Sequence, residues 1–125
     1  MGMTLTEFLL ARIAEDEELP GVATERIYVC DDGHIETPTE QWDDGSDRLP
    51  NHYNSWRSVY DPARVLAECA AKRAIVEVHE PFQSETRGEC CWICGPGGAP
   101  WPCETLRALA KVYADHPDYL PEWTP

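Results

Sequence analysis

Residues 90–98 read Cys-Cys-Trp-Ile-Cys-Gly-Pro-Gly-Gly, and this stretch decides the fold that we expect for the chain. Cys91 and Cys94 are separated by two residues and followed by glycine, which is the form of a zinc knuckle. That spacing lets a tight turn aim both sulfur atoms at one ion, while glycine leaves backbone N–H groups free to approach the thiolates. The C-terminal half is therefore predicted to be organised by one metal ion.

A tetrahedral site needs two more ligands, and we expect them on either side of the knuckle. Cys103 follows Pro102 at the start of a predicted helix, where unpaired N–H groups favour a thiolate. His79 lies at the end of the preceding predicted helix, on its inner face. Together with Cys91 and Cys94 these residues would hold one structural Zn²⁺. Four protein ligands leave no open position for water, so the site is not expected to be catalytic.

The fourth ligand has rivals, and one other pair of residues has metal-binding spacing. The residues that could take the place of His79 are His116, Cys90 and Cys69. Cys90 could also replace Cys91, because three residues between two ligands is an allowed spacing. Cys30 and His34 form a second, weaker metal pair with the same spacing.

Three thiolates and one imidazole would leave a zinc site with a net negative charge. Lys72 falls in the middle of the inner face of the helix predicted to begin after Asp61, where a purely apolar stripe would not place a cation. Lys72, Arg73 or Arg107 could offset the charge from outside the ligand set.

Helix signals recur at three places. Residues 4–18 have apolar side chains at helical spacing, with Thr4 or Thr6 available as the cap and Pro20-Gly21 as the expected end. Residues 61–80 begin with an Asp-Pro pair and should stop before Pro81. A last helix is expected from Pro102 onward, because apolar residues follow it at intervals of three and four.

Strand signals are weaker and are concentrated before residue 60. Residues 26–37 read as a small hairpin, and residues 38–60 look irregular. The predicted fold class is α+β: a helix-rich small domain with one short β-hairpin and a C-terminal, treble-clef-like zinc knuckle. We expect a single domain over 1–125, with an acidic helix, hairpin and irregular loop over 1–60 and a helix, knuckle and helix over 61–125.

The chain is acidic, and the charge is uneven. It has 125 residues and a formal net charge of −13, of which residues 1–61 contribute −10. Such a field repels phosphate backbones, so direct nucleic-acid binding is not expected. The N-terminal half would instead present a surface to a protein partner, for which a basic protein is the candidate.

Targeting and membrane signals are missing from the sequence. The first residues lack the basic segment and long apolar run of an export signal, and no stretch approaches the roughly 18–20 apolar residues of a membrane span. We therefore expect a cytoplasmic protein that does not enter membranes. In that compartment the six cysteines favour metal ligands and buried thiols over disulfides.

Several stretches together resemble a domain-of-unknown-function family of small proteins from actinobacteria and their phages. They are residues 4–17 (TLTEFLLARIAEDE), 61–76 (DPARVLAECAAKRAIV), His79, the Cys91/Cys94 pair, 102–110 (PCETLRALA) and 113–119 (YADHPDY). The resemblance covers about two-thirds of the chain. Residues 20–60 depart from it, because the family's usual Thr-Pro-Gly-Pro-Trp stretch is missing after the first helix. The resemblance implies phage association, and it carries no assigned activity.

The leading interpretation is a non-enzymatic, zinc-stabilised binding or regulatory protein. The alternatives are a thiol redox protein that uses Cys91 and Cys94, and an acidic mimic of nucleic acid. Zinc-dependent deaminase chemistry is excluded by the residues after His79 and Cys103, since neither His-x-Glu nor Pro-Cys-x-x-Cys occurs at these positions.

Overall fold

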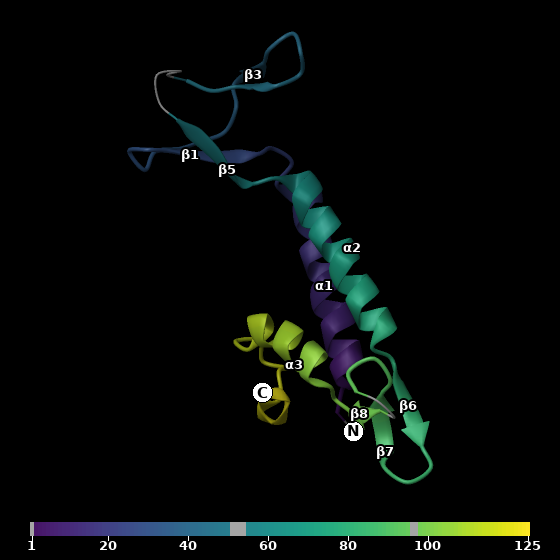
Figure 1. Cartoon of the computed structure of the whole chain (residues 1–125). Coiled ribbons are helices and arrows are strands. Elements are labelled where there is room, and N and C mark those ends of the chain that lie inside the picture. The colour runs from purple at the N-terminus through teal and green to yellow at the C-terminus, as the bar shows by residue number, and fades with distance from the viewer. Residues whose placement is uncertain (1, 51–54, 96–97) are drawn as a thin grey trace. The chain divides into compact units, whose positions relative to one another are not determined.

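A computed structural model of the chain describes residues 2–50, 55–95 and 98–125. The chain forms two compact units. The first unit comprises Met1–Asp16 and Cys69–Pro125, and the second comprises Glu17–Glu68. The α+β class expected from the sequence is confirmed, because helices occur together with small antiparallel sheets (Figure 1). The single-domain organisation stays a prediction.

The helices of the described residues are α1 (Leu5–Val22), α2 (Pro62–Val78) and α3 (Glu104–Ala110), with short 3₁₀ turns at Lys111–Tyr113 and Pro121–Trp123. Thr4 caps α1: its hydroxyl accepts the N–H of Glu7 at 3.1 Å and donates to the Glu7 carboxylate at 3.1 Å. Asp61 caps α2 by accepting the N–H of Ala63 at 3.0 Å. None of these helices is long and apolar enough to cross a membrane.

The first helix extends beyond its predicted end. Pro20 was expected to stop it, but α1 continues to Val22, and the N–H of Ala23 still donates to the carbonyl of Leu19 at 2.8 Å. Proline removes one helical hydrogen bond and disturbs the turn before it. Here the loss falls in the last turn, close to where the helix ends anyway.

The second unit contains a three-stranded antiparallel sheet in the order β2-β1-β5, where β1 is Ile27–Cys30, β2 is Ile35–Glu36 and β5 is Trp56–Tyr60. The predicted hairpin over 26–37 is confirmed by the pairing of β1 with β2. The segment 38–60 is more regular than expected: it contains β5 and a small hairpin of β3 (Glu40–Gln41) with β4 (Asp47–Arg48). Residues 51–54 of that segment lie outside the described residues.

The core of the first unit is built around Phe8 on α1, which is fully buried. Four rings of the C-terminal segment surround it, with centroid distances between 5.1 and 6.3 Å: Tyr113, His116, Tyr119 and Trp123. Leu106 and Ala110 are buried on the inner face of α3, as the apolar spacing predicted. The aromatic tail therefore packs back onto the first helix.

A second three-stranded sheet follows α2 directly, in the order β6-β7-β8 (Figure 1). Its strands are β6 (Pro81–Ser84), β7 (Gly88–Cys91) and β8 (Ala99–Pro100), and both pairs are antiparallel. The sequence did not predict this sheet, because the strands are short and rich in glycine, proline and cysteine. It fixes the position of the knuckle, which begins where β7 ends.

Gly98 lies against the β6–β7 hairpin so closely that no side chain fits. Its φ angle is +101°, and a Cβ atom added there would lie 2.9 Å from the Cβ of Cys90 and 2.9 Å from the ring of Phe82. Gly88 also has a positive φ, of +76°, but a Cβ atom there would meet nothing within 4 Å. A side chain at Gly88 would therefore meet only backbone strain, whereas a side chain at Gly98 would meet backbone strain and steric overlap as well.

We expect Gly98→Ala to destabilise the protein more than Gly88→Ala. The Gly88 variant bears only the cost of a left-handed alanine, about 1–2 kcal/mol. The Gly98 variant adds overpacking against Cys90 and Phe82, which costs about 1–3 kcal/mol more. Chemical denaturation of both variants measures the difference, and equal losses would contradict the close packing of Gly98.

Candidate metal centre

His79 is positioned by the end of α2. Pro81 disfavours helical geometry at the residue before it, so the helix ends at Val78 and His79 follows at once. The Nδ1 atom of His79 lies 2.7 Å from the carbonyl oxygen of Ile75. Since a carbonyl can only accept, Nδ1 carries the proton and Nε2 keeps a free lone pair. The side chain is buried, with 8% of the residue exposed, and is held as metal-binding histidines usually are.

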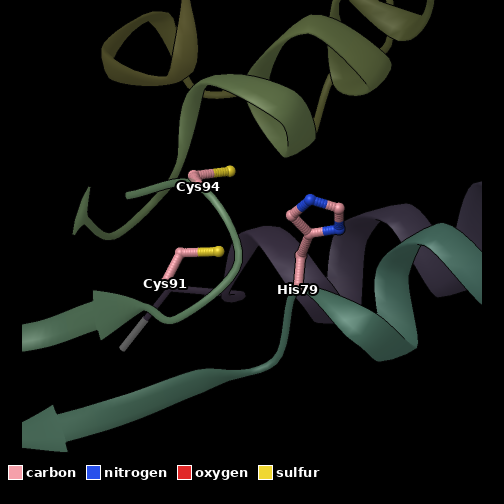
Figure 2. A group of neighbouring side chains, drawn as sticks. All are labelled: His79, Cys91 and Cys94. Carbon is pink, nitrogen blue, oxygen red and sulfur yellow. The ribbon is translucent and has the colours of Figure 1, made fainter. Parts of the chain in front are cut away.

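Cys91 and Cys94 reach the same place from the knuckle. Cys91 is the last residue of β7 and is fully buried, and Cys94 lies on the loop that follows. Figure 2 shows both sulfur atoms directed toward the imidazole of His79. The ligand atoms of these three residues all lie within 4.8 Å of one another. Such a cluster can hold a metal ion.

Cys103 is the N-cap residue of α3 and has 1% of its surface exposed. Its thiol forms hydrogen bonds with the thiols of Cys94 and Cys91, so the three cysteines lie next to one another. These hydrogen bonds help to raise the pKa of Cys103. Burial is the main cause, and together these effects raise the pKa of Cys103 to about 12; the backbone N–H of Leu106 acts in the opposite direction. The structure therefore brings Cys103 beside Cys91 and Cys94, but Cys103 is not among the residues whose ligand atoms all lie within 4.8 Å of one another, which are His79, Cys91 and Cys94.

Cys94 has a different environment from its neighbours. It is exposed, and its sulfur lies 3.3 Å from the hydroxyl of Thr105. This hydroxyl is the main cause of a lowered pKa at Cys94, and the thiols of Cys91 and Cys103 act in the same direction. The cluster therefore has a buried side and an open side, and its negative charge would be held mainly at the open side.

The rivals for the fourth position lie elsewhere. The ring of His116 accepts hydrogen bonds from the guanidinium of Arg12, and its Nδ1 atom also accepts one from the N–H of Asp118. Cys90 is buried beside Cys91 in β7, but adjacent residues of a strand point to opposite faces. Cys69 is buried in α2 and acts on the pKa of Tyr113. None of these three is in the His79 cluster, and none of the six cysteines, all within the described residues, forms a disulfide.

Two of the cations expected to offset the charge of the cluster, Lys72 and Arg107, have different surroundings. The ammonium of Lys72 lies 3.3 Å from the hydroxyl of Tyr113, which in turn donates to Asp16 at 2.8 Å. Arg107 lines the same cavity as Cys94, a hollow of about 450 Å³ between the knuckle loop and the start of α3. Arg107 is therefore better placed than Lys72 to offset the charge of the cluster.

Sequence reasoning missed two groups that hold the cluster in place. The Ile75 carbonyl that orients His79 gave no signal, because every helical residue has a carbonyl four positions earlier. Thr105 gave none either, since its contact with Cys94 depends on how α3 meets the knuckle loop. Asp32 was also missed: its carboxylate joins the predicted Cys30 and His34 pair in a second cluster.

Comparisons with known proteins support the resemblance described above. No curated protein and no solved structure matches this chain. One family model does match, over residues 2–125, and its description is a family of unknown function, DUF6221. The match includes both units and every residue of the candidate metal centre. The chain therefore belongs to the DUF6221 family.

Proposed function

We propose that His79, Cys91, Cys94 and Cys103 hold one structural zinc ion. The proposal rests mainly on the convergence of His79, from the end of α2, with Cys91 and Cys94, from the end of β7 and its loop. Cys103, at the start of α3, is added as the fourth ligand because its thiol contacts those of Cys91 and Cys94. The Ile75 carbonyl leaves Nε2 of His79 as the only nitrogen that can bind a metal. A set of three thiolates and one imidazole is a common structural zinc site.

The ion would contribute directly to the fold of the first unit. The β6-β7-β8 sheet is small, and the two large apolar side chains of the knuckle loop, Trp92 and Ile93, are exposed and so add little buried core. Zinc binding in small zinc-finger peptides is worth about 10–16 kcal/mol, which is as large as the whole net stability of a typical domain, about 5–15 kcal/mol. Folding of this region would then depend on the ion.

The protein itself would act as a non-enzymatic binding or regulatory module in the cytoplasm. With four protein ligands the ion has no open position for a substrate. The second unit carries 12 acidic and 4 basic side chains, and many of the carboxylates are exposed. Such a surface suits a basic protein partner and opposes nucleic acid. The phage association implied by the resemblance belongs to this proposal as well.

Removal of zinc should unfold residues 79–113. We expect a strong chelator to increase amide hydrogen exchange over β6, β7, β8 and α3, because these segments lose the bond network that joins them. The first part of α2, residues 62–68, belongs to the second unit, holds none of the proposed ligands and serves as the internal reference. Exchange that does not change with chelator would contradict a structural metal.

The ligand set can be tested against a neighbouring cysteine of the same strand. Cys91→Ser, Cys103→Ser and His79→Ala should each lose one equivalent of bound zinc, measured by elemental analysis of the purified protein. Cys90→Ala is the matched control, since Cys90 is equally buried but is outside the cluster. It should keep the metal. If the native thiols of Cys91 and Cys94 react quickly without releasing metal, the redox alternative would replace the zinc proposal.

Zinc affinity should rise with pH. The thiol of Cys103, with its pKa raised to about 12 by burial, is protonated at neutral pH, so an ion that binds it must displace a proton. Each displaced proton makes the apparent affinity increase roughly tenfold per pH unit. Competition with a chromophoric chelator at several pH values measures the slope. An affinity independent of pH would exclude ligation by thiolates.

A basic partner should depend on the exposed carboxylates of the second unit. We expect the triple variant Asp31→Asn, Glu36→Gln, Asp43→Asn to lose most of its captured partner from an extract of the source cells. The control neutralises three exposed carboxylates of the first unit: Glu77→Gln, Glu85→Gln, Glu122→Gln. The control should bind like the wild type. Equal losses from both variants would indicate a general effect of net charge rather than a surface on the second unit.

A further inference from the structure

The turn between β1 and β2 has a defined geometry that brings its first and last residues together. The N–H of Cys30 donates to the carbonyl of His34 at 3.0 Å, and the N–H of Gly33 donates to the carbonyl of Cys30 at 3.0 Å. Gly33 has a φ angle of +84°, as a three-residue hairpin loop with a left-handed last position requires. Cys30 and His34 are therefore the closing pair of the hairpin, and such facing residues have Cβ atoms about 5 Å apart.

Three different donor types meet at this turn. The sulfur of Cys30, a carboxylate oxygen of Asp32 and a ring nitrogen of His34 all lie within 4.8 Å of one another. Cys30 is buried, with 6% of its surface exposed, whereas Asp32 and His34 are exposed. The thiol is fixed in the sheet because β1 pairs with β5 through Cys30 and Trp56. The two other donors reach it from the loop.

We propose that Cys30, Asp32 and His34 form a second divalent transition-metal site, with an open coordination position. Thiolate, imidazole and carboxylate together suit ions of the zinc and cobalt class, whereas Mg²⁺ and Ca²⁺ require oxygen ligands throughout. Three protein ligands leave one position of a tetrahedron for water or a small ligand. The site differs in this respect from the closed Cys₃His set proposed in the first unit.

The surroundings allow a ligand to approach the ion. A cavity of about 220 Å³ lies beside Cys30 and is lined by Val29, Asp31, Ser55, Trp56 and Arg57 as well as by Cys30 itself. Its wall carries one positive side chain, Arg57, and one negative side chain, Asp31. Val29 and Cys30 belong to β1, and Trp56 and Arg57 belong to β5, so the cavity lies along the sheet and not in a loop alone.

Cobalt titration of the full chain tests the proposal independently of the zinc centre. A Co²⁺ ion bound by a thiolate shows a sulfur-to-metal charge-transfer band in the near ultraviolet. We expect the triple variant Cys91→Ser, Cys94→Ser, Cys103→Ser, which keeps no thiolate at the first centre, to retain one such band, which belongs to Cys30. Addition of His34→Ala to this variant should abolish the band. The band that survives loss of the three thiolates reports the second site whether or not the first centre binds metal. Amide hydrogen exchange over β1 and β5 verifies that the second unit remains folded in both variants.

The contribution of Asp32 is tested against another exposed carboxylate of the same hairpin. Asp32→Asn should weaken the remaining Co²⁺ site by at least about tenfold, the smaller effect usually seen when a residue that merely orients a ligand is lost. Glu36→Gln removes an exposed carboxylate of β2 that is outside both the cluster and the cavity, and it should leave the affinity unchanged. The proposal is overturned if the triple serine variant shows no charge-transfer band, or if Glu36→Gln and Asp32→Asn weaken binding equally.

Discussion

The hydrogen bond from Nδ1 of His79 to the carbonyl of Ile75 connects the architecture of the helix to the chemistry of the centre. It uses a carbonyl near the end of α2 that would otherwise lack a helical partner, and it turns the other ring nitrogen away from the helix. The knuckle reaches that nitrogen because the β6–β7 hairpin reverses the chain and pairs Cys91, at the end of β7, with Pro81, at the start of β6 and close to His79. Two local features, a helix end and a short hairpin, thus determine where the sulfur atoms gather.

Most residues of the candidate metal centre could be predicted, because their types and their spacing in the sequence are typical of metal ligands. Cysteine pairs with two intervening residues have few other uses in a chain without disulfides, and Pro102 marks the helix on which Cys103 lies. The choice of His79 over His116 followed from its place at a helix end, and the structure groups His79 with Cys91 and Cys94. The role of these residues as ligands stays a prediction until metal is measured.

Other parts of the fold could not be predicted because their determinants are not local. Strand β5 pairs with β1 across 26 or more positions, and β8 has only two residues, so neither shows a usable alternation. Lys72 was one of three candidates, with Arg73 and Arg107, to offset the charge of the metal centre, but its ammonium lies 3.3 Å from the hydroxyl of Tyr113, a residue 41 positions later. A helical wheel shows which side of a helix faces inward, but it does not show which partner lies there.

The packing of Trp123 and its neighbouring rings on Phe8 has a consequence for biosynthesis. The helix that carries Phe8 is synthesised before the rings that cover it, which follow more than 100 residues later. At roughly 5–20 residues per second, the apolar face of α1 waits on the order of 5–20 seconds for these rings to be made. During that interval the nascent chain contains a hydrophobic helix without its packing partners, and the core of the first unit can form only after the interval has passed.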